Sequence, residues 1–227
     1  MKQFLTALLC LATVAVLPAN AAVPRDSLIK RLDTCEAILQ DLQASTKTAI
    51  PADVLRRAKG IVIINQFQAG FVFGLKDGYA IAMVRRPNGK WSVPAFLKAG
   101  EISFGLQAGG RSTNTVMLLM DDTAARLLFK SRFNFGAEAK AAAGIRSAER
   151  DAVTKPLPND ANVLVYSLSE GYYLGAALKT GYMQPDEAAN RTFYNTNNRM
   201  PELLYSDWVQ PPAEARFLMD YLARLTN

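Results

Sequence analysis

Apolar residues between positions 26 and 45 recur every three or four residues, which is the spacing of one face of a helix. Charged residues fill the positions between them, so we predict an amphipathic helix that begins after Asp26 as N-cap and ends near Ser45. The apolar stripe either packs on the domain or lies in a membrane interface, and acidic residues on the polar face weaken the second interpretation. The stripe consists of Leu28, Ile29, Leu32, Cys35, Ile38, Leu39 and Leu42.

After residue 60 the pattern changes to short stretches rich in β-branched and aromatic residues, which is typical of strands. These stretches are 61–64, 71–73, 79–84, 91–96, 101–106, 115–120, 162–168 and 172–178. Three dipeptides that favour tight hairpin turns stand between consecutive members: Asp77-Gly78, Asn88-Gly89 and Glu170-Gly171. The pattern therefore predicts a mostly antiparallel meander and not a parallel sheet of the Rossmann type.

Glycines interrupt these predicted strands repeatedly. Within a strand, glycine marks a bend, a bulge or the close approach of another backbone. We therefore predict a strongly curved sheet, with closure toward a partial barrel as one form that the curvature could take. The glycines in question are Gly70, Gly74, Gly105, Gly109, Gly110 and Gly175.

Two further helices are predicted near the C-terminus, over 186–194 and 212–225, with a polar loop at 195–198 between them. The alanines of 136–151 favour helix, but a glycine interrupts this stretch and its structure stays ambiguous. The predicted fold class is α+β, with N-terminal and C-terminal helices around the curved antiparallel sheet.

Residues 1–21 have the pattern of a secretory signal peptide. Lys2 precedes an apolar run that Pro18 ends before it reaches the roughly 20 residues of a membrane-spanning helix. A small-residue motif then ends at Ala21, where we expect cleavage. We therefore expect a periplasmic or secreted protein in which Cys35 is the one remaining cysteine, so that no disulfide forms within the chain.

The composition suits one globular domain, with 227 residues of which 50% are hydrophobic and 20% charged. Histidine is absent, which excludes Ser-His-Asp triads, Cys-His pairs and His-bearing zinc sites within the chain. The sequence also lacks a phosphate-binding loop and a dinucleotide fingerprint. Asp121 and Asp122 are interpreted as the cap of a helix over 124–129. We expect no catalytic residues, no cofactor and no metal site.

The net charge is +6, or roughly +5 once Lys2 is removed with the leader. A positive field concentrates polyanions and anionic membrane surfaces, so an anionic partner is expected. Nucleic acid is not expected, because the basic residues are spread thinly and do not interleave with aromatic residues as a stacking groove requires.

A series of short motifs, in order along the chain, resembles the SYLF family. The motifs are Ile50-Pro51, Ala58-Lys59-Gly60-Ile61, Ala69-Gly70-Phe71 with Gly74, Gly89-x-Trp91-Ser92-x-Pro94-x-Phe96, Gly105-Leu-Gln107-Ala-Gly109, 115–120, Gly136-Ala-Glu-Ala139, Tyr166-Ser167-x-Ser169-x-Gly171-x-Tyr173, and Ala188-Ala-Asn190 before Phe193-Tyr194. The resemblance covers about residues 28–195 and departs from the family at Gln68, at Asn114 and in 144–148. It divides the chain into the leader, a SYLF-like domain over 22–195 that includes the N-terminal helix, and a C-terminal helical extension over 196–227.

That resemblance implies binding to phospholipid head groups, phosphoinositides in eukaryotic members, through basic surface residues and an amphipathic N-terminal segment. Fungal members are described as actin-binding as well. The candidates for holding phosphate fall in two groups, each of which is otherwise a set of solvated surface charges. Arg56, Arg57 and Lys59 lie on a short helix predicted to begin at Pro51, and Lys140, Arg146 and Arg150 lie around the glycine-bearing segment. Trp91 and Phe96 are expected in the core.

The expected function is a non-enzymatic phospholipid-binding module of the cell envelope that docks peripherally on anionic head groups. The alternative is an envelope protein-interaction or scaffold domain without lipid affinity. A hydrolase that uses carboxylates such as Asp121 and Glu138 is the least favoured class, because the chain has no histidine. Actin is not an expected partner, since an exported protein does not meet it.

Overall fold

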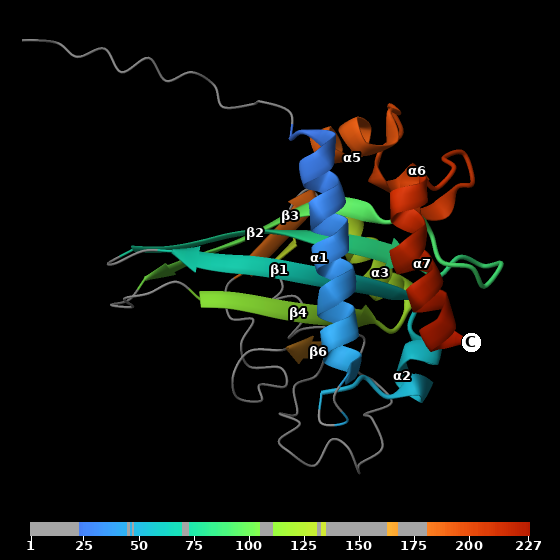
Figure 1. Ribbon diagram of the computed structural model, residues 1–227, viewed down its shortest axis with the longest axis horizontal. Coiled ribbons are helices and arrows are strands. Elements are labelled where there is room, and N and C mark those ends of the chain that lie inside the picture. The colour runs from blue at the N-terminus through green and yellow to red at the C-terminus, as the bar shows by residue number, and fades with distance from the viewer. Residues whose placement is uncertain are drawn as a thin grey trace, which may run out of the picture.

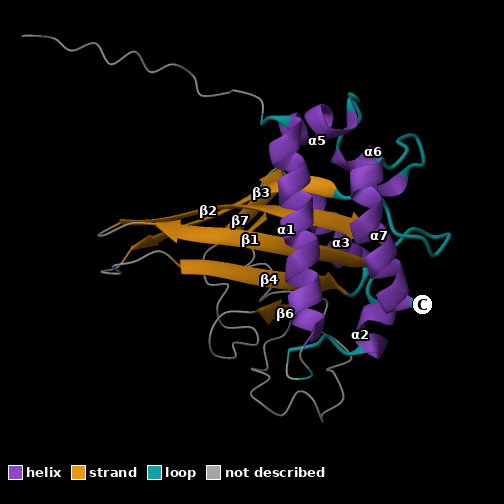
Figure 2. Ribbon diagram, in the orientation of Figure 1, coloured by secondary structure: helices purple, strands orange, loops and turns teal. Residues whose placement is uncertain are grey.

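The computed structural model describes residues 23–44, 46, 48–69, 73–104, 111–130, 133–134, 163–167 and 181–227. Within these ranges the chain forms one antiparallel sheet with helices against both of its faces (Figure 1). The N-terminal and C-terminal helices, α1 (Arg25–Ala44) and α7 (Ala213–Thr226), stand side by side across one face (Figure 2). The predicted α+β class is confirmed.

The remaining elements are shorter. The other helices are α2 (Ala52–Arg57), α3 (Asp122–Arg126), the 3-10 turn η1 (Leu127–Phe129), α5 (Glu187–Tyr194) and α6 (Met200–Tyr205). The strands are β1 (Gly60–Ala69), β2 (Phe73–Val84), β3 (Ala95–Phe104), β4 (Arg111–Leu119), β5 (Phe133–Asn134), β6 (Val163–Ser167) and β7 (Gly181–Pro185). Their order in the sheet is β5-β7-β3-β2-β1-β4-β6, and every neighbouring pair is antiparallel.

The long strand β1 lies near the middle of the sheet, where Ile63 stands opposite Ile81 of β2 and Val116 of β4. The strands β1, β2 and β3 form the predicted meander, whereas β4 crosses to the free side of β1. The described strands form a curved but open sheet with β5 and β6 at its edges, so the barrel-like form is not reached.

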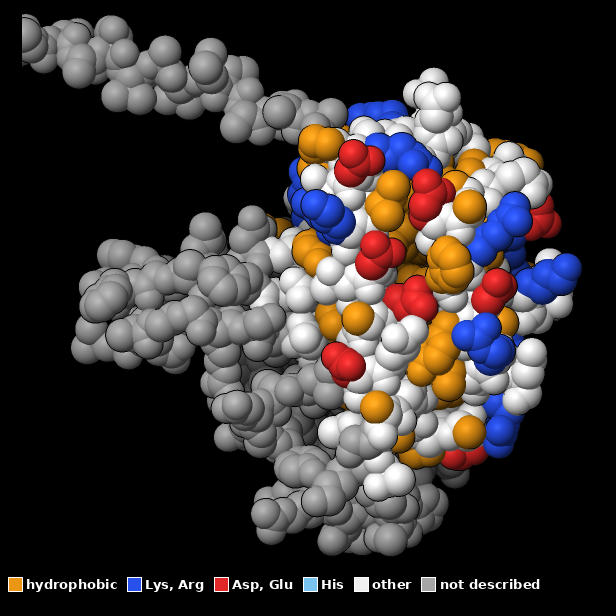
Figure 3. Space-filling view, viewed as in Figure 1, with side chains coloured by type: hydrophobic (Ala, Val, Ile, Leu, Met, Phe, Trp, Pro, Cys, Tyr) orange, Lys and Arg blue, Asp and Glu red, His pale blue; other side chains and the backbone are white. Residues whose placement is uncertain are grey.

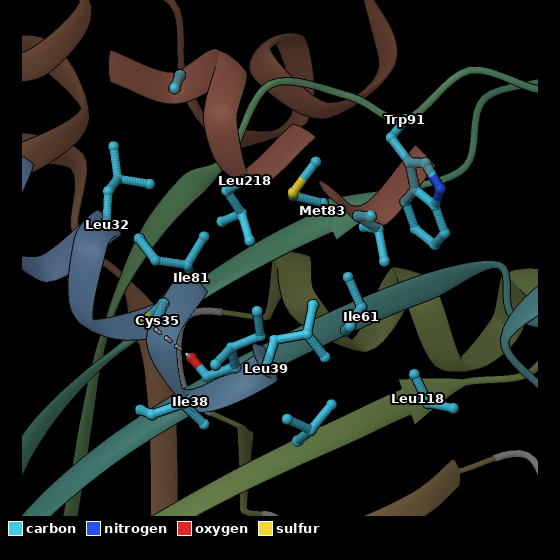
Figure 4. Packing of buried hydrophobic residues seen from close by; sticks show 14 of the residues in the cluster. Leu32, Cys35, Ile38, Leu39, Ile61, Ile81, Met83, Trp91, Leu118 and Leu218 are labelled. Atoms are coloured by element: carbon cyan, nitrogen blue, oxygen red, sulfur yellow. Dashed lines mark hydrogen bonds between the residues drawn. The ribbon is translucent and has the colours of Figure 1, made fainter. Parts of the chain in front are cut away.

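The sheet face under α1 and α7 holds the first of two cores (Figure 4). Six residues of the predicted α1 stripe are buried there: Leu28, Leu32, Cys35, Ile38, Leu39 and Leu42. They lie against Ile61, Ile81, Met83 and Leu118 of the strands and Leu218 of α7. A fully buried aliphatic side chain stabilises a fold by about 1.5–3 kcal/mol, so the stripe holds α1 on the sheet. The first interpretation of the stripe, packing on the domain, therefore describes this structure.

Cys35 lies at the centre of this core. Its Sγ donates to the backbone carbonyl of Ile63 at 3.8 Å, and burial raises the pKa of the thiol. The thiolate, which is the nucleophilic form of cysteine, is therefore disfavoured at this position.

The opposite face of the sheet holds the second core, which contains many small residues. Ala80, Ala82, Ala95 and Ala99 lie there beside larger aliphatic residues such as Ile64, Leu97 and Met117. The cover comes from α3, η1 and α6, which contribute Ala124, Ala125, Leu128, Met200 and Leu204. Both faces of the sheet are thus buried over part of their area, which explains why the central strands are almost continuously apolar.

The predicted turn at Asp77-Gly78 is wrong, because both residues lie inside β2, where Gly78 pairs with Gln66. A Cβ at Gly78 would lie 2.9 Å from the Cα of Gln66 and would also collide with the carbonyl oxygen of Asn65. Glycine is required here by the close approach of two backbones and not by a positive φ.

The predicted turn at Asn88-Gly89 is confirmed. Gly89 has a φ of 79°, and the backbone N–H of Lys90 donates to Oδ1 of Asn88 at 3.0 Å. The two strands predicted at 91–96 and 101–106 are joined in one longer strand, β3, which runs from Ala95 to Phe104. Before that point Trp91 forms an isolated bridge with Arg85.

The cap predicted at Asp121 is confirmed, because its carboxylate accepts the N–H of Ala124 at 2.6 Å. Asp186, predicted as the first residue of a helix, caps α5 instead, and its carboxylate accepts the N–H of Ala189 at 3.2 Å. The elements β5, β7 and α6 had no counterpart in the sequence pattern. The predictions for 136–151 and 172–178, for the Glu170-Gly171 turn and for Gly70, Gly105, Gly109, Gly110 and Gly175 fall outside the described residues.

The Trp91-Ser92-x-Pro94-x-Phe96 motif has a structural role. Trp91 and Phe96 are 6% and 0% exposed, which confirms their predicted place in the core. The side-chain amide of Asn190 accepts the N–H of Phe96 at 2.8 Å and donates to its carbonyl at 3.2 Å. Nε1 of Trp91 donates to Oγ1 of Thr226 at 3.0 Å. The motif thus joins β3 to α5 and to the end of α7.

Candidate functional site

Three chain segments meet at one end of the sheet, where β1 begins and β2 and β4 end. Gly60 pairs with both Val84 and Leu119. The N–H of Lys59 donates to the carbonyl of Leu119, and the N–H of Arg85 donates to the carbonyl of Lys59, each at 2.8 Å. The α2–β1 junction therefore lies directly against the β2–β3 connection, on the right in Figure 1.

Two of the predicted site residues, Arg56 and Arg57, occupy the last turn of α2. Val54 and Leu55 on the same helix are each 1% exposed, so α2 is fixed by its apolar face and presents both arginines to solvent. Lys59 is exposed as well. The prediction that Lys59 lies on the helix is wrong, because Ala58 already has an extended backbone that leads into β1. Lys59 therefore follows the helix.

Arg85 and Lys90 were missed as candidates, yet they lie at the same end of the sheet. Nη1 of Arg85 donates to the carbonyl of Arg56 at 2.7 Å, and its Nε donates to the carbonyl of Gly89 at 3.1 Å. Lys90 is exposed after the turn. The sequence carried a usable signal, because basic residues flank the predicted Asn88-Gly89 turn and so had to lie at a strand end.

Arg86 has a different role from its neighbour Arg85. Its Nε donates to the carbonyl of Leu204 at 2.9 Å, its Nη2 donates to that of Leu203 at 3.1 Å, and its Nη1 pairs with the carboxylate of Asp207. Only 10% of the side chain is exposed. Arg86 therefore joins the β2–β3 connection to α6 and is not free to bind a ligand.

We call Arg56, Arg57, Lys59, Arg85 and Lys90 the basic end. Within the described ranges, the only ion pair of these five joins Arg57 to Asp53 at 3.6 Å, and both side chains are more than half exposed. Exposed pairs of this kind contribute little and leave the charge accessible. Lys and Arg side chains line the right margin of the molecule over α2, the end of α7 and the β2–β3 connection, and another group lies at the upper left over α1 (Figure 3).

The second group of predicted site residues, Lys140, Arg146 and Arg150, lies outside the described residues. The expectation that these three hold phosphate together with Arg56, Arg57 and Lys59 stays a prediction.

The charges of α2 change the pKa of a tyrosine in β6, at the edge of the sheet. Burial raises the pKa of Tyr166 in β6 to about 12, with a further increase from the charge of Asp53 and a decrease from that of Arg57. The hydroxyl of Tyr166 therefore stays neutral at ordinary pH.

Fixed guanidinium and ammonium groups on an exposed surface can bind anionic oxygens. Arginine offers a planar fork of donors and lysine a point charge, and both match phosphate. In the described part of the chain, no group of three or more His, Cys, Asp or Glu side chains is placed to hold a metal ion. Among the described helices, none combines the length and the apolar character needed to cross a bilayer.

The profile of the Ysc84 family, described as "Las17-binding protein actin regulator", matches residues 100–225, which is more than half of the chain. The chain belongs to the Ysc84 family. The SYLF resemblance of the sequence motifs is thereby confirmed.

Ysc84 relatives come from animals and yeast. "SH3 domain-containing YSC84-like protein 1" of Pongo abelii is 30% identical over 181 residues, which are 78% of this chain and 52% of that protein. Its Homo sapiens counterpart is 29% identical over 181 residues with the same shares. "LAS seventeen-binding protein 3" of Saccharomyces cerevisiae (strain ATCC 204508 / S288c) is 31% identical over 166 residues, 72% of this chain and 36% of that protein. The chain thus spans about half the length of the animal relatives and less of the yeast one. No solved structure matches the chain.

The names of the Ysc84 family and its yeast members describe binding and regulation, which agrees with a non-enzymatic class. They also refer to actin regulation and to binding of the protein Las17. The comparisons therefore do not support the expectation that actin is excluded as a partner, which depends on the predicted leader alone.

Proposed function

We propose that this Ysc84 protein is a non-enzymatic module that docks on anionic phospholipid surfaces through its basic end. The observation that carries the proposal is that Arg56, Lys59, Arg85 and Lys90 gather at one end of the sheet and make no ion pair with any described residue. We further propose that the leader directs the chain to the periplasm or the exterior, where its membrane association is peripheral.

The geometry favours a surface over a single small ligand. The five cations of the basic end lie on the outside of α2, just after it and around a hairpin turn. Four of the five are exposed, so they suit a flat layer of head groups. Each basic residue close to an anionic leaflet contributes about 1 kcal/mol, so the five residues of the basic end supply about 5 kcal/mol at most. Electrostatic attraction alone would therefore hold the protein weakly and reversibly, with a strong dependence on salt.

The test is co-sedimentation of the mature chain, beginning near Ala22, with neutral and with anionic vesicles across a salt series. The variant Arg56→Ala with Lys59→Ala removes two unpaired cations of the basic end. The control, Lys30→Ala with Arg191→Ala, removes two exposed cations, one from the first half of α1 and one from α5. The beginning of α1 and α5 lie at the top of Figure 1, away from α2. Both variants change the net charge equally.

We expect the wild type to need anionic lipid and to dissociate as salt rises. The basic-end variant should bind roughly 30-fold more weakly, which is the loss of about two contributions of 1 kcal/mol, and the control should change less than about threefold. Equal losses in both variants would mean that net charge and not this site attracts the vesicles. A wild type that ignores anionic vesicles would overturn the proposal.

A protein partner is the second candidate, and the name of the yeast relative and the description of the family favour it. It is tested by co-sedimentation with purified actin filaments in the same buffers. Pelleting with filaments at high salt, by a chain that ignores vesicles, would favour this function over lipid docking.

A further inference from the structure

The connection between α6 and α7 is tied to the same end of the sheet as the basic end. Arg86, next to Arg85, binds the carbonyls of Leu203 and Leu204 at the end of α6 and pairs with the carboxylate of Asp207 in the connection. Because Arg85 in turn binds the carbonyl of Arg56, a chain of contacts runs from α2 to residue 207.

The connection also has contacts of its own that restrict its start. The hydroxyl of Ser206 donates to the carbonyl of Glu202 at 2.6 Å and accepts the N–H of Trp208 at 3.4 Å. Pro211 and Pro212 then lead into α7, whose Arg216 donates to the carbonyl of Pro211 at 3.4 Å. Trp208 is thus presented on a segment that is fixed at both ends.

Trp208 is 73% exposed, whereas the other tryptophan of the chain, Trp91, is 6% exposed and hydrogen-bonded to Thr226. The large hydrophobic side chains that are exposed in the described ranges are Tyr205, Trp208 and Phe217, and all three lie between the end of α6 and the first half of α7. Three exposed apolar side chains on one short stretch of chain make this stretch a candidate contact surface.

We propose that Trp208 inserts into the head-group region of the anionic bilayer on which the basic end docks. This inference rests on the proposed function and adds an apolar anchor to the electrostatic attraction of the basic end. The cations of the basic end, at the same end of the sheet, are complementary to an anionic membrane. Tryptophan is the residue that membrane interfaces favour, because its ring is apolar and its N–H can still bond to head groups or water. A single projecting ring on a tied segment fits a soft, disordered surface, which needs no matching groove.

The two tryptophans give the protein its own reporter. Trp208 should move from water into the interface when vesicles are added, so the emission of the wild type should shift to the blue and be quenched by brominated lipid. The variant Trp208→Phe leaves only Trp91, which is buried already, so its emission should not change. Co-sedimentation of Trp208→Ala should show roughly tenfold or more weaker binding, as expected for loss of part of the area of a buried aromatic ring.

The salt series separates the anchor from the charges. Trp208→Ala should weaken binding by the same factor at every salt concentration, whereas Arg56→Ala with Lys59→Ala should reduce the salt dependence itself. If the wild type sediments with anionic vesicles but its emission stays unchanged and Trp208→Ala binds normally, the insertion is wrong and docking by the basic end stands. If the wild type does not sediment at all, the proposed function and the anchor are both overturned.

Discussion

The guanidinium of Arg85 donates a hydrogen bond to the backbone carbonyl of Arg56, 29 residues earlier in the chain, at 2.7 Å. A second bond from the same group, to the carbonyl of Gly89 at 3.1 Å, closes the turn that follows β2. One side chain therefore holds α2 against the hairpin turn and fixes where the cations of the basic end lie. Arg85 acts here as a brace and as a charge at the same time.

Arg85→Lys separates these two roles. Lysine keeps the charge but has no planar fork to span two carbonyls, so we expect the free energy of unfolding to fall by about 1 kcal/mol while vesicle binding stays close to that of the wild type. Urea unfolding measures the first and co-sedimentation the second. Arg126→Lys is the control, since Arg126 is an exposed arginine on α3, and it should leave both unchanged. Loss of vesicle binding in Arg85→Lys would mean that lipid contacts the guanidinium itself.

Asn190→Ala should be strongly destabilising. Asn190 is fully buried, and its amide accepts the N–H of Phe96 and donates to the carbonyl of Phe96. Alanine therefore leaves the buried N–H without this partner and the carbonyl with the N–H of Asp186 alone. We expect a loss of about 2–4 kcal/mol in urea unfolding. Asn197→Ala, at an exposed position nearby, should cost less than about 0.5 kcal/mol. Similar values for the two variants would contradict a structural role for the asparagine of the family motif.

Leu222→Ala tests whether the segment 196–227 is an appendage or a part of the domain. Leu222 in α7 is fully buried in the core that α1 shares with the sheet. We expect a single cooperative transition with a loss of about 2–5 kcal/mol. Phe217→Ala, on the exposed side of the same helix, should change the stability by less than about 0.5 kcal/mol. A separate early transition in Leu222→Ala, with the main transition unmoved, would show that α7 folds as an independent extension.

Alkaline pH should destabilise the fold through Tyr166. Its pKa is raised from 10.0 to about 12 in the folded protein, chiefly by burial, so the folded state favours the neutral phenol. The stabilisation is complete below pH 10 and is lost as the pH rises from about 10 through 12, because the unfolded chain ionises first. Tyr166→Phe should flatten this part of the stability curve and remove one late step from the ultraviolet titration of the tyrosines. If the stability of that variant still falls at alkaline pH as in the wild type, the loss of stability comes from other groups. Tyr194, whose pKa burial also raises, is one of these.

Local patterns in the sequence determined most of the helices, but not α6, and one side of the site. The apolar stripe of α1 and the caps Asp121 and Asp186 were predictable because helical periodicity and capping depend on residues within four positions of each other. The basic residues of α2 were identified in the same way. The Asn88-Gly89 turn was predictable because its chemistry lies in the dipeptide itself.

Tertiary structure decided what no local pattern contains. Gly78 and Gly89 have a similar dipeptide signal in the sequence. Gly78 is required because the backbone of β1 lies close to it, whereas Gly89 provides the positive φ of a turn. Hydrogen bonds between residues far apart in the chain place β4 beside β1. Bonds of the same kind join Arg85 to Arg56 and Arg86 to α6. Such bonds form only where burial of the two cores has already brought the segments together. The sequence alone therefore determined which residues are basic, and the tertiary structure determined which of them lie at the same end of the sheet.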